Sequence, residues 1–482
     1  MSAPTASGSS ARQLPVNLFT RGAYAIPQST YFIPSDWRRF QLSELINKVL
    51  GHGSDSGAAP VPFDFVVEGE VLRGSLEAWV KKNRGDDEET AINVEYIQSV
   101  LPPSEVGRWE QEDWVSGLSL ARKGHVLVSS YLSHARVLPL GTEGSALYTL
   151  PLPTSLGATS CTWVSPAEVT SDILVAAGGV DRAVHVFSLP SLDPDVAASE
   201  GSTAREVYTL MGHSGPISNV IASSSGRDII SSSWDGALHL YALPEEEPTE
   251  HMLPADPTSY LPGQKKRRKI EGDAQRIIEG LTDGDATGDK GQGWRRAPDA
   301  VFRGHAGRIG GAVWDREDET RVWSAGWDGS IRGWDAESGA NVLVRQGPSD
   351  KALLCVDQFG PSGTLAAGSM DRTVTLWDTR QATSVIAQTL NVGSPVPSIA
   401  CHPTSNFTLA TATYAGACQI WDVRSPKHAL FSVQRKRDES SRTVTKNGKV
   451  LGERLLATAW DGEVLVAGGE DGEVGIWHAR GQ

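Results

Sequence analysis

Residues 324–335, SAGWDGSIRGWD, constrain the fold of this chain more than any other stretch. They read as a strand, a tight turn at Asp328 and Gly329, and a second strand that ends in Trp334 and Asp335. One such hairpin cannot bury its own apolar face. A chain that repeats the hairpin must therefore stack the copies or close them into a ring.

Copies of this hairpin recur along the chain, each with its turn residue six positions before an apolar or aromatic residue of the second strand. The turn residues of the seven units are Leu132, Asp181, Asp235, Asp328, Asp371, Ala415 and Asp471. Apart from insertions, these positions return to a period of about 40–45 residues, which is typical of four-stranded propeller blades. From about residue 100 onward the chain resembles the WD-repeat propeller family, and unrelated hairpins in a large all-β protein are the alternative.

Two units carry polar residues at the positions that form a buried, hydrogen-bonded tetrad in WD-repeat proteins. The two sets are His305, Ser324, Asp328 and Trp334, and His213, Ser231, Asp235 and Tyr241. A buried carboxylate must be paired to offset the cost of removing it from water. Sets of Ser, His and Asp also occur in hydrolases, but the repeat context favours a structural role here.

Residues 11–99 predict a separate α+β domain. We expect strands at 14–21, 23–32, 63–67, 69–72 and 91–97, a helix at 41–50 and a helical turn at 75–81. This order resembles the ubiquitin-like roll, although other small α+β domains share it. The chain continues beyond this domain without a Gly-Gly terminus, so we interpret it as a built-in module. Residues 1–10 are small and polar and are expected to be disordered.

The last hairpin lies almost at the end of the chain, so the outer strand of the seventh blade has to come from elsewhere. Residues 100–108, just before the first blade, are the available segment. A propeller closed in this way leaves no exposed sheet edge at the junction. The predicted fold class is therefore mainly β: a seven-bladed propeller at 100–482 preceded by the ubiquitin-like domain.

Composition narrows the class of function. The formal net charge of −14 argues against wholesale nucleic-acid binding. The cysteines lack CxxC spacing and are expected to be buried thiols; they are Cys161, Cys355, Cys401 and Cys418. We find no secretory signal, no membrane-spanning run, and no GxxxxGK[ST], HExxH or GxSxG motif. The sequence predicts an interaction protein and not an enzyme.

The largest insertion, at about 244–299, separates the third and fourth units and has the composition of a disordered loop. It contains five consecutive basic residues, Lys265, Lys266, Arg267, Arg268 and Lys269. Such a run favours a nuclear-import signal or a nucleic-acid contact, and a solvated charge run is the remaining alternative. A second basic insertion at 434–450 is either another contact arm or a solvated loop.

Several short sequence segments show a resemblance to a more specific family. Residues 61–76 (VPFDFVVEGEVLRGSL), 93–103 (NVEYIQSVLPP) and 112–116 (EDWVS), with the KKRRK insertion, resemble the family of Ytm-type WD-repeat ribosome biogenesis factors. That family supplies the WD-repeat subunit of the Pescadillo–Bop complex. The resemblance implies a nuclear, nucleolar and nucleoplasmic assembly factor of the large (60S) ribosomal subunit, needed for pre-rRNA processing. It implies no membrane partner, and it leaves a contact of the basic arm with pre-rRNA in the pre-60S particle open.

The resemblance also implies two protein contacts. The propeller would bind the propeller of the Bop-type WD-repeat protein, in a heterotrimer with Pescadillo. The ubiquitin-like domain would dock on the metal-ion-dependent adhesion site of Midasin, a large AAA-type ATPase that removes the factor from pre-ribosomes. The resemblance places the family's metal-binding glutamate at Glu89, with Glu88 as the alternate. Mg²⁺ prefers oxygen ligands and would be shared with Midasin, so no cofactor or metal is expected on this chain alone.

A ubiquitin-pathway adaptor with a substrate-binding propeller is the alternative from another class. It predicts an apolar Leu/Ile/Val patch on the exposed face of the ubiquitin-like sheet instead of a functional acidic loop.

Overall fold

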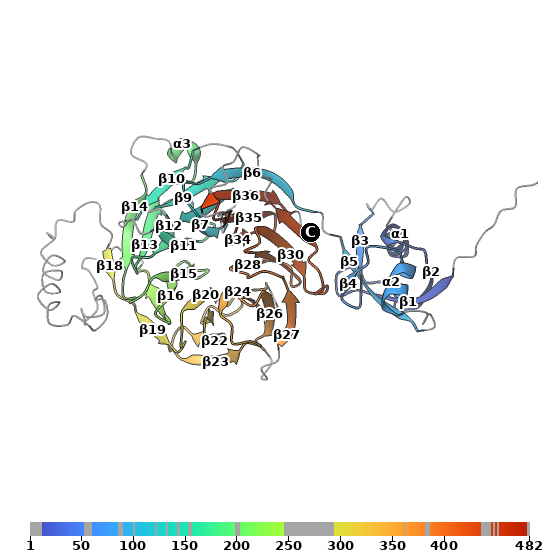
Figure 1. Cartoon of the computed structure of the whole chain (residues 1–482). Helices are drawn as coiled ribbons and strands as arrows, with labels where there is room; N and C mark the ends of the chain where they lie inside the picture. Colours follow the sequence, from blue (N-terminus) through green and yellow to red (C-terminus); the bar gives the residue numbers. More distant parts are fainter. Residues whose placement is uncertain are drawn as a thin grey trace, which may run out of the picture. The chain divides into compact units, whose positions relative to one another are not determined.

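The computed structural model describes residues 12–52, 60–84, 90–99, 102–120, 122, 124–131, 134–141, 145–152, 157–197, 203–244, 294–360, 362–380, 386–434, 445–446, 449–450 and 453–479. They form two compact units, an N-terminal α+β unit and a ring of β-sheets (Figure 1).

The N-terminal unit is a five-stranded mixed sheet with two helices. Its elements are β1 (Gln13–Phe19), β2 (Thr30–Pro34), α1 (Arg39–Leu50), β3 (Phe63–Val67), β4 (Glu70–Val71), α2 (Leu76–Asn83) and β5 (Ile92–Gln98). The strand order is β2-β1-β5-β3-β4, with β1 and β5 parallel and the other pairs antiparallel. This is the topology of the predicted ubiquitin-like roll.

The second strand differs from its expected range of 23–32, because β2 begins only at Thr30. The backbone before it is engaged elsewhere. The hydroxyl of Tyr96 donates to the carbonyl of Tyr24 (2.7 Å) and accepts from the N–H of Ile26 (3.0 Å). Pro27, which follows, has no N–H to offer to a strand ladder. These residues therefore form a loop across the end of the core.

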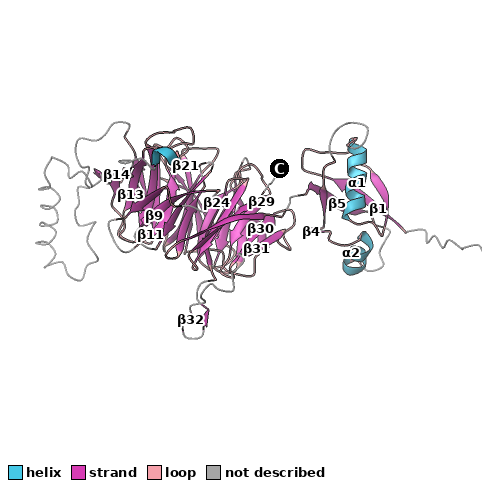
Figure 2. Ribbon diagram, turned by 90° about the horizontal axis from the view of Figure 1, so that it is seen from above, coloured by secondary structure: helices cyan, strands magenta, loops and turns pink. Residues whose placement is uncertain are grey.

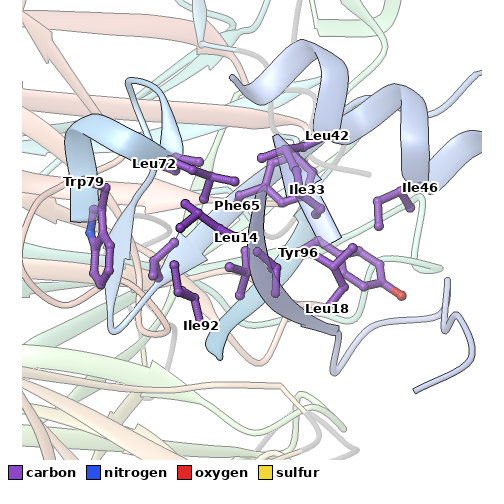
Figure 3. Close-up of a cluster of buried hydrophobic side chains, with 14 of the residues drawn as sticks. Leu14, Leu18, Ile33, Leu42, Ile46, Phe65, Leu72, Trp79, Ile92 and Tyr96 are labelled. Carbon is purple, nitrogen blue, oxygen red and sulfur yellow. The ribbon is translucent and has the colours of Figure 1, made fainter. Parts of the chain in front are cut away.

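Alternating apolar residues of the strands and one face of each helix make the core of this unit (Figure 3). Leu14, Val16 and Leu18 point inward from β1, as their alternation predicts. Leu42 and Ile46, one helical turn apart on α1, cover the same face of the sheet. The buried side chains drawn in Figure 3 include Leu14, Leu18, Ile33, Leu42, Ile46, Phe65, Leu72, Trp79, Ile92 and Tyr96.

The propeller consists of seven sheets in the described residues, each with its first strand at the centre of the ring (Figure 1). The blades are numbered here in chain order. Blade 1 contains β7 (Val115–Ser119), β8 (His125–Ser130), β9 (His134–Pro139) and β10 (Tyr148–Pro151); blade 2 contains β11 (Ala158–Trp163), β12 (Ile173–Gly179), β13 (Val184–Leu189), β14 (Arg205–Leu210) and β18 (Trp294–Arg296); blade 3 contains β15 (Ile217–Ala222), β16 (Asp228–Ser233), β17 (Ala237–Ala242) and β19 (Ala300–Arg303).

The remaining four blades follow the same plan. Blade 4 contains β20 (Ile309–Trp314), β21 (Arg321–Gly326), β22 (Ser330–Asp335) and β23 (Asn341–Gln346); blade 5 contains β24 (Leu353–Gln358), β25 (Thr364–Ser369), β26 (Thr373–Asp378) and β27 (Ile386–Asn391); blade 6 contains β28 (Ser398–Cys401), β29 (Thr408–Ala412), β30 (Ala417–Asp422) and β31 (Phe431–Gln434); blade 7 contains β34 (Leu455–Trp460), β35 (Val464–Gly469), β36 (Glu473–His478) and β6 (Ser104–Glu110).

Glycines on the second strand of a blade allow the next blade to pack closely. A Cβ on Gly178 would lie 2.6 Å from Ile217, the first residue of the inner strand of blade 3. A Cβ on Gly468 would lie 2.6 Å from Val115, which begins the inner strand of blade 1. A side chain at either glycine would push neighbouring sheets apart. The small residues of the repeat are thus required by the ring.

The ring closes between its two ends. The inner strand β34 of blade 7 packs against the inner strand β7 of blade 1. Strand β6, from before blade 1, pairs antiparallel with β36 and becomes the outer strand of blade 7. The prediction that this segment closes the propeller is confirmed, with the strand at Ser104–Glu110 instead of 100–108.

The large insertion is shorter than expected at its C-terminal end. We predicted disorder to about residue 299, but Trp294–Arg296 forms β18 and pairs parallel with β14 at the outer edge of blade 2. Its apolar contact explains the order, because Trp294 packs on the cluster that contains Val207 and Tyr208. Residues 245–293 lie outside the described residues. In the second insertion, β32 (Thr445–Lys446) and β33 (Lys449–Val450) form a short hairpin.

Helices are rare in the propeller (Figure 2), where α3 (Pro194–Ala197) is a single short turn. Of the helices in the described ranges, none has both the length and the apolar content needed to cross a bilayer. The four cysteines are free, and Cys161, Cys401 and Cys418 are buried while Cys355 is half-buried.

Candidate functional site

In blade 4 the tetrad expected from the sequence is present. The Nδ1 atom of His305 lies 3.1 Å from both carboxylate oxygens of Asp328, and Nε2 lies 2.8 Å from Oγ of Ser324. The indole N–H of Trp334 donates to the same hydroxyl (2.8 Å). The chain of bonds links the turn between β21 and β22 to the third strand of the blade.

The donors and acceptors of this tetrad follow in one consistent order. A carboxylate only accepts, so Nδ1 of His305 carries the proton that is donated to Asp328. The hydroxyl of Ser324 accepts from Trp334 and donates to Nε2. Burial lowers the pKa of His305 more than the neighbouring Asp328 raises it, so the imidazole is neutral, as this order requires. A neutral, fully bonded His has no free nitrogen for acid–base chemistry.

Blade 3 repeats the first part of this arrangement with a different end. Nδ1 of His213 lies 3.0 Å from Asp235, and Nε2 lies 2.7 Å from Oγ of Ser231. The hydroxyl of Tyr241 donates to the carbonyl of Met211 at 3.2 Å. Tyr241 thus links the third strand of blade 3 to the segment that carries His213. In blade 4 the equivalent residue, Trp334, bonds the hydroxyl of Ser324 instead.

Blade 3 also contains a cluster that the sequence did not predict. The imidazole of His239 stacks on that of His213, with ring centroids 3.6 Å apart and planes 8° apart. One donor atom from each of His213, Asp235 and His239 lies within 4.8 Å of the others, a spacing that could suit a metal ion. However, hydrogen bonds already occupy both nitrogens of His213. Burial lowers the pKa of His239 to about 3, so this imidazole is neutral at physiological pH and stacks on His213 without charge repulsion. We therefore interpret the cluster as a hydrogen-bonded, stacked pair.

The glycine of each Gly-His pair has a definite steric role. A Cβ on Gly212 would lie 3.1 Å from Nδ1 of His239, and one on Gly304 would lie 2.8 Å from a guanidinium nitrogen of Arg332. His239 and Arg332 hold the same place in their blades, four residues after the turn aspartate. The glycine allows the backbone before the histidine to approach this side chain.

Blade 2 holds a buried histidine that was not predicted from the sequence. His185 lies on β13 with Nε2 2.9 Å from Asp181 and Nδ1 2.7 Å from Glu206. Burial alone would lower its pKa, but the hydrogen bonds to the two carboxylates, and their charges, raise the pKa to about 9. The imidazole is therefore a cation at neutral pH, in contrast to His305.

A sequence signal for these histidines exists. Blade 2 reads DRAVH from Asp181 to His185, and blade 3 reads DGALH from Asp235 to His239. Both place a histidine four residues after the turn aspartate, on the same side of the third strand. Blade 5 uses a different solution, because the hydroxyl of Ser349 donates to its turn aspartate, Asp371, at 2.6 Å.

The acidic loop of the N-terminal unit runs between α2 and β5. Glu88 and Glu89 lie outside the described residues, but the residues on either side of the loop are described. Arg84 directly follows α2, and its guanidinium donates to the hydroxyl of Thr90 (3.3 Å) and lies 2.6 Å from Glu68. The same guanidinium lies over the ring of Trp79 at 5.9 Å. The ends of the loop are thus held together next to the core.

The basic arm, Lys265 to Lys269, also lies outside the described residues, so its place in the sequence remains its only description. In the described residues, the polar sets of this chain are engaged in holding blades and turns together. The arrangement is suited to a rigid ring that binds other molecules through its faces and loops.

Comparison with known proteins agrees with both units. Residues 14–80 match the NLE (NUC135) domain, and residues 204–241, 296–335 and 340–378 match the WD domain, G-beta repeat. The chain is 31% identical over 465 residues to a protein of Coprinopsis cinerea named Ribosome biogenesis protein YTM1, covering 95% of this chain and 93% of the relative. Proteins of that name from Laccaria bicolor and Aspergillus oryzae are 29% and 28% identical, covering 95% and 99% of this chain and 93% and 97% of theirs.

The fold therefore defines a WD-repeat propeller protein with a ubiquitin-like N-terminal unit of the NLE type. The sequence identity to the relatives, and the share of both chains that it covers, define the family of this protein. The chain belongs to the YTM1 family of ribosome biogenesis proteins.

Proposed function

We propose that this protein is a non-enzymatic assembly factor of the large ribosomal subunit, needed for pre-rRNA processing in the nucleolus and nucleoplasm. The observation that carries the proposal is the match to YTM1 proteins over nearly the full length of both chains. A shared fold alone would not support a shared function, because propellers serve many functions. Here both units and their order are shared with the relatives.

The propeller binds the propeller of a Bop-type WD-repeat protein and joins Pescadillo in a heterotrimer. A closed ring supports this role, because its faces are made of short turns and strand ends held by buried bonds such as those of His305 and Asp328. Rigid elements that present a surface lose little conformational entropy on binding.

The ubiquitin-like unit docks on the adhesion site of Midasin through Glu89, with Glu88 as the alternate. Mg²⁺ belongs to the partner's site, and this chain would supply one carboxylate oxygen to an open coordination position. The contacts of Arg84 with Thr90 and Glu68 support this proposal, because they hold both ends of the acidic loop against the core. A loop with fixed ends presents its carboxylates in fewer arrangements than a free tail.

Binding of the full chain to the Midasin adhesion domain in Mg²⁺ tests this contact. We expect Glu89→Ala and Glu89→Gln to abolish binding, and EDTA to have the same effect on the unchanged chain. Glu77→Ala is the matched control, since Glu77 is an exposed carboxylate of α2 that pairs with Lys81. Unchanged binding by both Glu89 variants, with loss in Glu88→Ala, would move the role to the alternate residue. Full binding by all three would rule out the acidic loop.

The ubiquitin-pathway adaptor is less well supported. Asn17, Asn93 and Thr30 form a polar ladder across β1, β5 and β2, with Asn17 donating to Asn93 at 3.0 Å and Thr30 donating to Asn17 at 2.8 Å. This part of the sheet is polar, whereas the adaptor needs an apolar patch there. Purification of the protein from nuclease-treated extracts distinguishes the two functions, by recovery of pre-60S proteins or of ubiquitin machinery.

A further inference from the structure

One face of the propeller is marked by the same backbone bond in every blade. In each blade the residue just before the turn position donates its N–H to the carbonyl of a residue at the start of the inner strand. The seven donor–acceptor pairs are Tyr131–Trp114, Val180–Gly157, Trp234–Pro216, Trp327–Arg308, Met370–Ala352, Tyr414–Pro395 and Glu470–Arg454. Inner strands of a propeller run in the same direction, so these pairs share one face, called here the turn face.

The turn face collects the exposed aromatic side chains of the ring. In the described part of the propeller, the aromatic side chains classed as exposed are Trp114, Tyr131, Trp234 and Trp327, each between 40% and 45% accessible. All four belong to the pairs that define the face, as does the exposed Met370. Trp, Tyr and Met are enriched in protein interfaces, and a gathering of them on one face of a soluble protein marks a contact surface.

Arg308 bridges blades 3 and 4 on the turn face. Its guanidinium carbon lies 4.0 Å from the ring centroid of Trp234 in blade 3 and 4.9 Å from that of Trp327 in blade 4. Within the described residues, this guanidinium makes no hydrogen bond or ion pair. Stacking on indoles holds the guanidinium in place while its N–H donors stay available.

The chemistry of Arg308 favours one kind of anionic partner. The carboxylates of Asp235 and Asp328, which follow the two tryptophans in the sequence, are bonded to His213 and His305. A nucleic-acid backbone needs several cations to neutralise its phosphates, whereas the two indoles hold one guanidinium. One carboxylate of a protein fits the fork of one arginine.

We propose that Arg308, held between Trp234 and Trp327, is the anchor at which the turn face binds a carboxylate side chain of a protein partner. The partner segment carries one Asp or Glu within an otherwise apolar stretch that covers the exposed indoles. This inference rests on the proposed function, because it takes the Bop-type WD-repeat protein as the partner. It adds the face, the anchoring residue and the chemistry of the partner's contact.

Calorimetry with the full chain and the purified Bop-type protein from the same organism tests the anchor. We expect Arg308→Ala and Trp234→Ala each to weaken binding at least tenfold, with melting temperatures close to that of the unchanged chain. Arg308→Lys is expected to weaken binding nearly as much, since lysine keeps the positive charge but lacks the planar, forked donors of the guanidinium. Arg321→Ala is the control: Arg321 is an exposed arginine of blade 4 at the opposite end of β21, paired with Asp318.

A charge exchange tests the carboxylate itself. Cross-linking and mass spectrometry locate the partner segment on the turn face, and its acidic residue is changed to Arg. The Arg308→Glu variant should not bind the unchanged partner. It should bind the partner variant in which the acidic residue is replaced by Arg.

The outcomes separate the two proposals. Binding that survives Arg308→Ala and Trp234→Ala would overturn the anchor and leave the proposed function standing. A lack of binding by the unchanged chain would overturn the proposed heterotrimer and the anchor with it. A single-stranded RNA oligonucleotide that binds the chain, loses affinity in Arg308→Ala and displaces no protein partner would overturn the carboxylate assignment.

Discussion

The Nε2 atom of His185 lies 2.9 Å from the carboxylate of Asp181, and both side chains are largely enclosed in blade 2. Glu206 holds the other nitrogen, so one imidazole separates two carboxylates. Without a cation between them, two buried carboxylates would repel each other and lack the partners that burial demands. The positive charge of His185 is therefore part of the structure of this blade.

The stability of blade 2 should depend on pH through His185. Its pKa is raised in the fold from 6.5 to about 9, so its contribution is fully present below about pH 6.5 and is lost as pH rises through 9. A shift of this size corresponds to an effect on the order of 3 kcal/mol. We expect His185→Gln to lower the free energy of unfolding strongly at pH 6 and weakly at pH 9.5, as measured by urea unfolding.

Val186→Ala serves as the control for this experiment. Val186 is fully buried on the same strand and does not titrate. The loss of unfolding free energy in Val186→Ala should therefore be similar at both pH values. A pH-independent cost for His185→Gln as well would show that the imidazole is not a structural cation.

The tetrad of blade 4 should be sensitive to the loss of its central hydroxyl. Ser324→Ala removes the partner of both Nε2 of His305 and Nε1 of Trp334. Each stranded buried polar group costs about 1–3 kcal/mol, so we expect a loss of stability of at least about 2 kcal/mol. Chemical denaturation measures it, with the exposed Ser338→Ala in the same blade as a control that should change little. Equal stabilities of the two variants would contradict the tetrad.

Closure by β6 should decide whether the ring is stable. A chain that begins at Gln98 keeps Ser104–Glu110, whereas one that begins at Glu110 leaves the outer edge of β36 unpaired and uncovers Val474 and Ile476. We expect the first to melt cooperatively in differential scanning fluorimetry and the second to lose the transition or melt far lower. Coincident melting curves would refute closure by this strand.

The turns between the second and third strands offer a test of backbone strain. Gly329 has φ of 73°, and Arg372 occupies the equivalent place in blade 5 with φ of 72°. A side chain in this left-handed region costs about 1–2 kcal/mol. Gly329→Ala should therefore lower the free energy of unfolding by about that amount, while Arg372→Gly should leave it equal or slightly higher. Destabilisation by Arg372→Gly would show that the arginine side chain makes a compensating contact.

The basic arm should direct the protein to the nucleus. Replacing Lys265, Lys266, Arg267, Arg268 and Lys269 by Ser in a fluorescently tagged chain is expected to abolish nuclear accumulation. The same change at Lys446 and Lys449, in the second basic insertion, provides the control. Nuclear accumulation unchanged by the first replacement would leave the run as a solvated charge cluster.

The repeat explains how much could be predicted from the sequence. The six-residue interval from Asp328 to Trp334 is local, because turn chemistry and alternation along two strands fix it, and so the copies and the ring could be counted. The alternation in β1 and the helical spacing of Leu42 and Ile46 identified the ubiquitin-like roll in the same way. The start of β2 and the strand at Trp294–Arg296 were missed because long-range partners, Tyr96 and β14, set them.

The sequence by itself determined the repeat, the polar residues of the blade 4 tetrad and the short segments that resemble the family. Each of these is a pattern of residues close together along the chain. Only the tertiary structure decided which side chains far apart in the sequence meet, within a blade or between blades. It brought Glu206 to His185, stacked His239 on His213, and placed Arg308 between Trp234 and Trp327. The physical reason is that pairing the strands of a blade and closing the ring make neighbours of residues that are distant along the chain, and a linear pattern does not contain these distances.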